Sequence, residues 1–133
     1  MIDPANVPDV GDKETLARYV LYSRHVRSSD NTLRPDAFMP LPYRELSVTR
    51  HLMATEAELW DVGEDVAAGL NRTLYGRGDF GVATCVDEEL GVTAAPIPGN
   101  PNHAHVVKWP VDKDAQKSIA QGIAASATFV PNP

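Results

Sequence analysis

Two histidines alternate within the segment 102–107, and they are the side chains of this chain best suited to do chemistry. A strand places every second residue on the same face, so His103 and His105 would project together, about 6 to 7 Å apart. Neutral imidazoles at that spacing can share a metal ion, move protons, bind an anion once protonated, or simply pack. We therefore predict a strand over 103–109 and take His103 and His105 as candidate catalytic residues.

Two arginine–histidine pairs near strand ends supply groups that could hold a substrate. A guanidinium group binds phosphate or carboxylate through two parallel hydrogen bonds, and imidazole can transfer protons. Neighbouring residues on a strand point to opposite faces, so each pair can send only one member to a given site. With two residues beside the histidine pair, the candidate substrate-binding residues are Arg24, His25, Arg50, His51, Asn102 and Trp109.

The His-x-His pair also resembles the first metal-binding motif of the cupins. In that family a glutamate a few residues later and a distant histidine complete the site, whereas Lys108 and Trp109 stand near that position here. His25 or His51 could supply a third ligand in space, and three histidines would suit zinc or another borderline metal. The sequence assigns no metal ligand and no cofactor, and a His-ligated metal-dependent enzyme stays one alternative.

Length and composition indicate one folded domain. The chain has 133 residues, of which 43% are hydrophobic and 23% are charged, which is ordinary for a globular protein. We expect residues 1–12, which contain two prolines and no periodicity, to form a flexible N-terminal arm, and residues 13–133 to form a single α+β domain. A single cysteine and no apolar run of membrane length or signal-peptide pattern favour a cytoplasmic protein without a membrane partner.

The charge balance limits the kind of partner. A formal net charge of −6 argues against nonspecific nucleic-acid binding by the whole surface. Arginines are nevertheless concentrated in the first half of the chain, whereas most of the charged residues within 56–89 are acidic. A basic patch could therefore face a small anionic ligand, or it could face this protein's own acidic helix.

Periodicity predicts five strands, near 17–23, 46–51, 79–86, 91–95 and 103–109. The strands 79–86 and 91–95 are expected to form a hairpin. Thr55 and Glu58 form a capping box that begins a helix over 56–71, and Asp112 or Asp114 begins another that reaches about residue 125. Three glycines predict a loop over 74–81. The expected fold is α+β, with a single mixed or antiparallel sheet of about five strands and two amphipathic helices packed on one side.

Several residues of the C-terminal half resemble small bacterial proteins with no assigned activity, among them Asn102, His105, Trp109 and Lys113. That resemblance implies a bacterial source and no particular chemistry. We predict a small soluble cytosolic binding or accessory protein that acts through the Pro-rich loop, the Arg-bearing strands and the His103/His105 face. The alternative is an enzyme on a phosphate-bearing substrate, such as a nucleotide or RNA. The partner, an unknown protein or small anionic ligand, is not identified, and homodimerisation is open.

Overall fold

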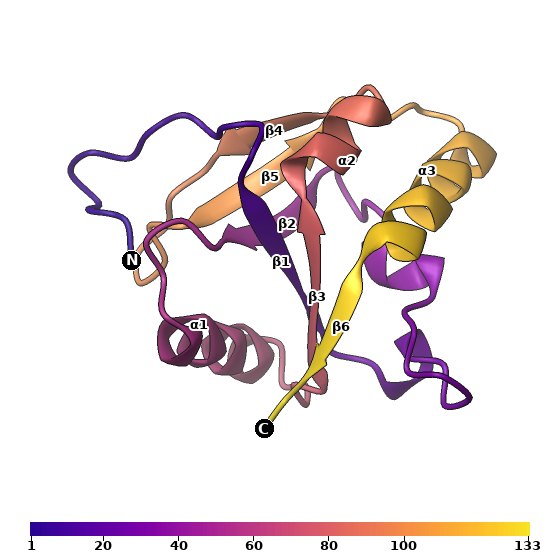
Figure 1. The fold of residues 1–133 in the computed structure, drawn as a ribbon, viewed down its shortest axis with the longest axis horizontal. Coiled ribbons are helices and arrows are strands. Elements are labelled where there is room, and N and C mark those ends of the chain that lie inside the picture. Colours follow the sequence, from indigo (N-terminus) through magenta and orange to yellow (C-terminus); the bar gives the residue numbers. More distant parts are fainter.

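A six-stranded antiparallel sheet forms the centre of the protein, which we describe from a computed structural model of residues 1–133 (Figure 1). The strands lie in the order β4-β5-β2-β1-β3-β6. They are β1 (Thr15–Val20), β2 (Leu46–Arg50), β3 (Gly76–Gly81), β4 (Gly91–Ala94), β5 (His103–Val107) and β6 (Thr128–Pro131). The predicted α+β class is confirmed, with six strands in place of about five.

Three helices cover the sheet on two faces, not on one as predicted (Figure 1). Helix α1 (Glu56–Gly69) lies on the face that carries Tyr19, whose hydroxyl donates to the backbone carbonyl of Leu59. Helices α2 (Val82–Asp87) and α3 (Lys113–Ser126) lie on the other face, where Ile123 joins the main hydrophobic core. Because both faces are covered only in part, one face of β2 and β5 stays accessible beside α1.

Local sequence explains where the two long helices begin. The hydroxyl of Thr55 accepts from the Glu58 amide, and the Glu58 carboxylate accepts from the Thr55 amide, which is the predicted capping box. Asp112 accepts from the Ala115 amide at the start of α3. Each bond satisfies a helix N–H group that has no partner within the helix.

The glycine-containing segment is a strand rather than the predicted loop, and the predicted strand 79–86 turns into a helix after Gly81. A Cβ at Gly78 would collide with Leu33 and Phe38, so glycine lets these side chains pack directly on β3. Val82 and Cys85, three residues apart, are the buried side of α2. As a result β4 pairs with β5 and not with the strand before it, which corrects the predicted hairpin.

Residues 1–12 contain no helix or strand, and three contacts fasten them to the sheet. Ile2 is buried, and its amide donates to the Asn102 side chain. The carbonyls of Pro8 and Asp9 accept from the guanidinium of Arg50. The N-terminal segment thus covers one end of the sheet.

Two short 3-10 turns, η1 (Ser23–His25) and η2 (Pro35–Phe38), connect β1 to β2. Phe38 of η2 is fully buried and packs edge-on against Phe80 of β3, with ring centroids 5.5 Å apart. The two strands share only two paired positions, Leu16 with Arg50 and Ala17 with Thr49. Beyond Ala17 they separate, and the gap that opens there becomes part of the cavity described below.

Candidate functional site

The two predicted catalytic histidines lie side by side on the accessible face of β5. Their ring centroids are 4.8 Å apart in an edge-to-face arrangement, and Ala104 between them points into the core. Nδ1 of His103 lies 2.8 Å from the Ala95 carbonyl oxygen. A carbonyl can only accept, so Nδ1 donates and Nε2 of neutral His103 keeps its lone pair. Nδ1 of His105 lies 2.8 Å from the Glu45 carboxylate at the surface.

His103 is the member of the pair that faces a cavity. Burial lowers the pKa of this imidazole, and the positive charge of protonated His105 lowers it further; the hydrogen bond that Nδ1 donates to Ala95 and the charge of Glu45 oppose this shift without cancelling it. His103 is therefore neutral at pH 7 and able to accept a proton at Nε2.

Trp109 lies in the hydrophobic core and not on the histidine face, which corrects the predicted alternation through 103–109. Strand β5 ends at Val107, and Lys108 takes a left-handed backbone conformation with φ of 68°. That turn sends the next side chain to the opposite face of the sheet. The indole N–H then donates to the Val106 carbonyl at 3.0 Å.

Arg50 and Asn102, two other predicted binding residues, are fully buried. Arg50 binds both carboxylate oxygens of Glu14 at 2.8 Å and the two N-terminal carbonyls. The Asn102 side chain donates to the carbonyls of Arg50 and Leu52. Both side chains hold the N-terminal segment and the β2–β5 end together, and neither reaches the cavity.

His51 lies under the N-terminal end of α1, away from the histidine pair. Its Nε2 is 3.0 Å from the carboxylate of Asp79, which also accepts from Arg77. Arg77 continues to Glu56 of α1 through two bonds of 2.9 Å. This chain of charged groups ties α1 to β2 and β3, and it uses His51 structurally. It also shows that Arg77 and Asp79 are committed to internal pairs.

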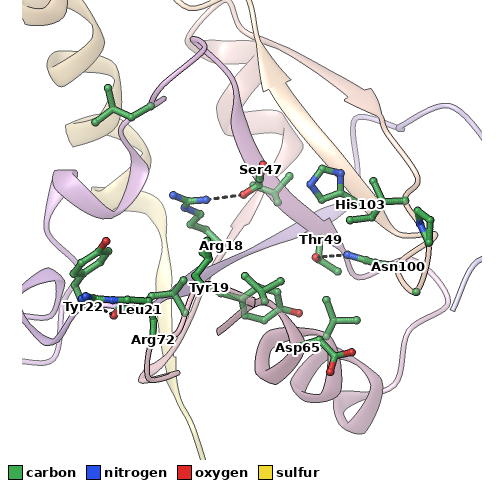
Figure 2. A pocket seen from close by; sticks show the side chains of 18 residues that line it. Arg18, Tyr19, Leu21, Tyr22, Ser47, Thr49, Asp65, Arg72, Asn100 and His103 are labelled. Atoms are coloured by element: carbon green, nitrogen blue, oxygen red, sulfur yellow. Dashed lines mark hydrogen bonds between the residues drawn. The ribbon is translucent and has the colours of Figure 1, made fainter. Parts of the chain in front are cut away.

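A cavity of about 640 Å³ opens between α1, the segment 97–100 and the gap between β1 and β2 (Figure 2). Its volume falls in the range of about 300 to 1,000 Å³ that is typical of small-molecule sites. Figure 2 shows Arg18 and Ser47 at the gap between the strands, with His103 and Asn100 across from them and Asp65 on the helix. The hydroxyl of Thr49 lies between, where it accepts from the Asn100 amide at 3.1 Å.

Arg18 is one of two arginines that line this cavity, and it has no acidic partner. Its Nε donates to the Ala37 carbonyl and its Nη1 donates to the Ser47 carbonyl, each at 3.0 Å. The ion pairs of the protein involve other cations. Burial lowers the pKa of Arg18 to about 10, so it stays charged at pH 7. Nη2 has no hydrogen bond within the protein. Every buried side-chain nitrogen of the protein has a partner, so Nη2 cannot be buried and is accessible.

Two more arginines flank the cavity through Tyr22. The guanidinium carbons of Arg72 and Arg24 lie 3.8 and 4.5 Å from the centroid of the Tyr22 ring. His25 packs against the same ring at 5.0 Å, and burial and then the charge of Arg24 lower its pKa. Arg72 lines the cavity, whereas Arg24 and His25 do not. Neither arginine takes part in an ion pair, so this side of an acidic protein is locally positive.

Of the predicted site residues only His103 lines the cavity, and the polar lining residues that the sequence analysis missed include Arg18, Arg72, Thr49 and Asn100. A signal for Arg18 was present, because it alternates with Leu16 and Val20 on the apolar side of a strand, where a charged residue is unusual. Asn100 lies in the Pro-rich segment that the sequence did indicate. Nothing in the sequence places Arg72, which follows α1, beside Tyr22.

The four histidines do not form the metal centre that was considered as an alternative. No group of three or more His, Cys, Asp or Glu side chains is placed to hold a metal ion. None of the helices has the length and apolar character needed to cross a bilayer. Comparison of the chain with protein-family models, with curated proteins and with solved structures gives no match.

Proposed function

We propose that this protein is a small cytoplasmic binding or accessory protein and that it takes a small organic anion into the cavity beside Arg18. The observation that carries the proposal is a half-buried guanidinium group that lines the cavity, has no counter-charge and has an accessible Nη2 without a hydrogen-bond partner. A buried charge without a partner costs free energy. An oxyanion would supply the missing charge and a charge-assisted hydrogen bond.

The other lining groups support the same proposal. Ser47, Thr49 and Asn100 offer polar groups near Arg18, and the nearby Arg72 has no acidic partner. The Pro-rich loop, an arginine-bearing strand and His103 all contribute to this one cavity. We propose that Arg18 binds the anion there, a role that the sequence analysis gave to Arg24 or Arg50. His105, on the same face as His103, stays outside the cavity.

A titration followed by NMR tests the proposal with benzoate and with benzamide, its neutral counterpart of the same shape. We expect benzoate to shift the signals of Arg18 Nε–H and of the Thr49 and Asn100 amides, and benzamide to leave them nearly unchanged. Replacing Arg18→Met should weaken benzoate binding roughly tenfold or more, the usual effect of removing a hydrogen bond to a charged group.

Arg27→Met is the matched control, because Arg27 also donates to a backbone carbonyl, that of Leu33, but lies outside the cavity. Arg18→Lys keeps the charge and should retain part of the affinity. Equal binding of benzamide and benzoate, or full benzoate affinity in folded Arg18→Met protein, would refute the proposal.

A second candidate is an enzyme on a phosphate-bearing substrate, favoured by the free Nε2 of His103 at the cavity. There His103 would accept a proton from water or a hydroxyl group while Arg18 holds the phosphate. Phenyl phosphate is a suitable probe, since its hydrolysis releases phenol and inorganic phosphate. Turnover that is lost in His103→Gln and kept in His105→Gln would establish that the protein is an enzyme. Binding of phenyl phosphate without turnover would support the binding-protein proposal instead.

A further inference from the structure

The outer wall of the cavity is apolar and unusually exposed. Leu41 and Leu70 are 66% and 62% exposed, and Ile97 and Val66 are 47% and 36% exposed. All four line the cavity, although only nine large hydrophobic side chains of the whole protein are exposed to this degree. Single exposed apolar residues are common on protein surfaces, whereas several gathered around one cavity indicate a surface that is covered in use.

These apolar residues come from three separate parts of the chain. Val66 lies in the last turn of α1 and Leu70 is the residue that ends this helix, Ile97 belongs to the Pro-rich segment, and Leu41 follows η2. They line the same cavity as Arg18, Ser47 and Thr49, which Figure 2 labels. The lining of the cavity therefore combines polar and cationic groups with exposed apolar side chains.

The charges along the cavity suit a ligand with one negative charge. Arg18 and Arg72 carry two positive charges, and Asp65 of α1 carries one negative charge and forms no ion pair. With His103 neutral, the lining has a net charge of +1, which a monoanion balances. A second negative charge on the ligand would exceed this balance and would be repelled by Asp65, which lines the same cavity.

We infer that the ligand is an amphipathic monoanion, with one oxyanion head at Arg18 and an apolar body that lies along Leu41, Val66, Leu70 and Ile97. The inference rests on the proposed function and adds the class of ligand. The head can be a carboxylate or a sulfate ester, because both present oxygen acceptors with a single charge. The apolar body explains why the outer wall is built from leucine, isoleucine and valine.

Calorimetric titration with acetate, butanoate, hexanoate and octanoate tests the apolar part. Affinity should rise along the series, by at most roughly fourfold for each methylene that becomes fully buried and by at least about tenfold in total. The double variant Leu41→Ser/Leu70→Ser should flatten this dependence. Val111→Ser is the matched control, since Val111 is 75% exposed but lies away from the cavity, and it should leave the dependence unchanged.

Three further ligands test the charged part. Octanamide, the neutral counterpart of octanoate, should bind more weakly by roughly tenfold. Octyl sulfate should bind about as well as octanoate. Octyl phosphate at pH 8, which carries nearly two negative charges because its second pKa is about 6, should bind more weakly than octyl sulfate, and tighter binding would overturn the single-charge inference.

The outcomes separate this inference from the proposed function. Benzoate binding that depends on Arg18, together with equal affinity for acetate and octanoate, would overturn the amphipathic ligand and leave the anion site intact. Absence of benzoate and octanoate binding would overturn both. The apolar wall could alternatively be an interface between two copies of the chain: a dimer in sedimentation equilibrium that Leu41→Ser/Leu70→Ser converts to monomer would overturn the inference in favour of that interface.

Discussion

Nη1 of Arg18 donates to the backbone carbonyl of Ser47 at 3.0 Å, across the point where β1 and β2 stop pairing. The guanidinium group thus replaces a backbone hydrogen bond that the separated strands cannot make. It also keeps the gap between the strands open and places a positive charge inside it. Strand separation and anion binding therefore depend on the same side chain, which is why Arg18→Lys is a useful partner for Arg18→Met.

The close packing of α1 on β1 sets one wall of the cavity. A Cβ built on Gly63 would lie 2.7 and 2.9 Å from ring carbons of Tyr19. We expect Gly63→Ala to push the helix outward and to lower the free energy of unfolding by about 1 to 3 kcal/mol. Gly69→Ala in the same helix is the control, because its Cβ would meet nothing within 4 Å, and alanine there should be neutral or stabilise by up to about 1 kcal/mol. Urea denaturation of both variants measures the difference, and equal stabilities would contradict it.

The ion pair between Arg50 and Glu14 should be the most important one for stability. Arg50 is fully buried, and removal of its partner leaves that charge uncompensated. We expect Glu14→Gln to lower the free energy of unfolding by about 3 to 5 kcal/mol. Glu45→Gln removes the partner of His105 in an exposed pair and should cost no more than about 1 kcal/mol. Chemical denaturation at pH 7 compares the two, and a loss that is no larger in Glu14→Gln would be inconsistent with the structure.

The same carboxylate predicts part of the acid sensitivity of the fold. Burial raises the pKa of Glu14, but hydrogen bonds from Arg50 and the Gly11 amide and the charge of Arg50 outweigh burial, so the net shift is downward. Because the pKa of Glu14 is lower in the folded than in the unfolded chain, this carboxylate stabilises the fold fully above the unfolded pKa of about 4.3. That stabilisation is lost as the pH falls through the folded pKa. Stability measured from pH 6 to pH 3 should therefore decrease less steeply in Glu14→Gln than in the wild type.

Elements with strong local signals could be predicted from sequence. The capping box of Thr55 and Glu58 and the cap of Asp112 located both long helices to within a few residues, because these bonds form between neighbours in the chain. Strict alternation in 103–107 likewise placed both imidazoles on one face. Local hydrogen bonding and side-chain period depend on few distant contacts, which explains this success.

The features that could not be predicted from the sequence depend mainly on contacts between segments that are distant in the chain. Gly78 is glycine because Leu33 and Phe38 pack on it, and no pattern near Gly78 reveals those partners. Arg50 shares a strand face with Leu46 and Val48, and its charge there suggested a binding role. In the structure the N-terminal segment lies over Arg50, and the carbonyls of Pro8 and Asp9 accept from it. The left-handed conformation of Lys108, which redirects Trp109, has no signal in that residue type, because such conformations favour glycine or asparagine.

Asn102 should be a structural clamp. Its side chain accepts from the Ile2 amide at 2.9 Å and donates to the carbonyls of Arg50 and Leu52. Asn102→Leu removes these bonds and leaves buried backbone groups without partners, at about 1 to 3 kcal/mol for each group left buried. We expect a large loss of stability, with faster hydrogen exchange at Ile2. Asn6→Leu is the control and should change stability little, because Asn6 is exposed and its side chain makes one long bond, to Asp3 at 3.4 Å. Loss of benzoate affinity in folded Asn102→Leu protein, without this destabilisation, would instead favour a binding role.

The ionisation of His103 provides a direct measure of its environment. Neutral His103 should be the Nδ1–H tautomer, since Nδ1 donates to Ala95, and long-range proton–nitrogen correlation spectra distinguish the two tautomers. Its pKa should lie below the ordinary value of about 6.5, because burial disfavours the imidazolium and protonated His105 adds to that effect. A predominant Nε2–H tautomer in the neutral form, or a midpoint above 6.5, would contradict the structure.

The lowered pKa of His103 also predicts the sign of a stability change. The unfolded chain binds a proton on this imidazole more readily than the folded chain does, so stability is complete above pH 6.5 and falls as the pH drops toward the folded pKa. His25, whose pKa is lowered as well, contributes in the same direction. Comparison of wild type with His103→Gln isolates the contribution of His103: between pH 7 and pH 5 the variant should lose less stability than the wild type. An anion bound at Arg18 would favour the imidazolium form, so benzoate should move the His103 midpoint upward in the wild type and not in Arg18→Met.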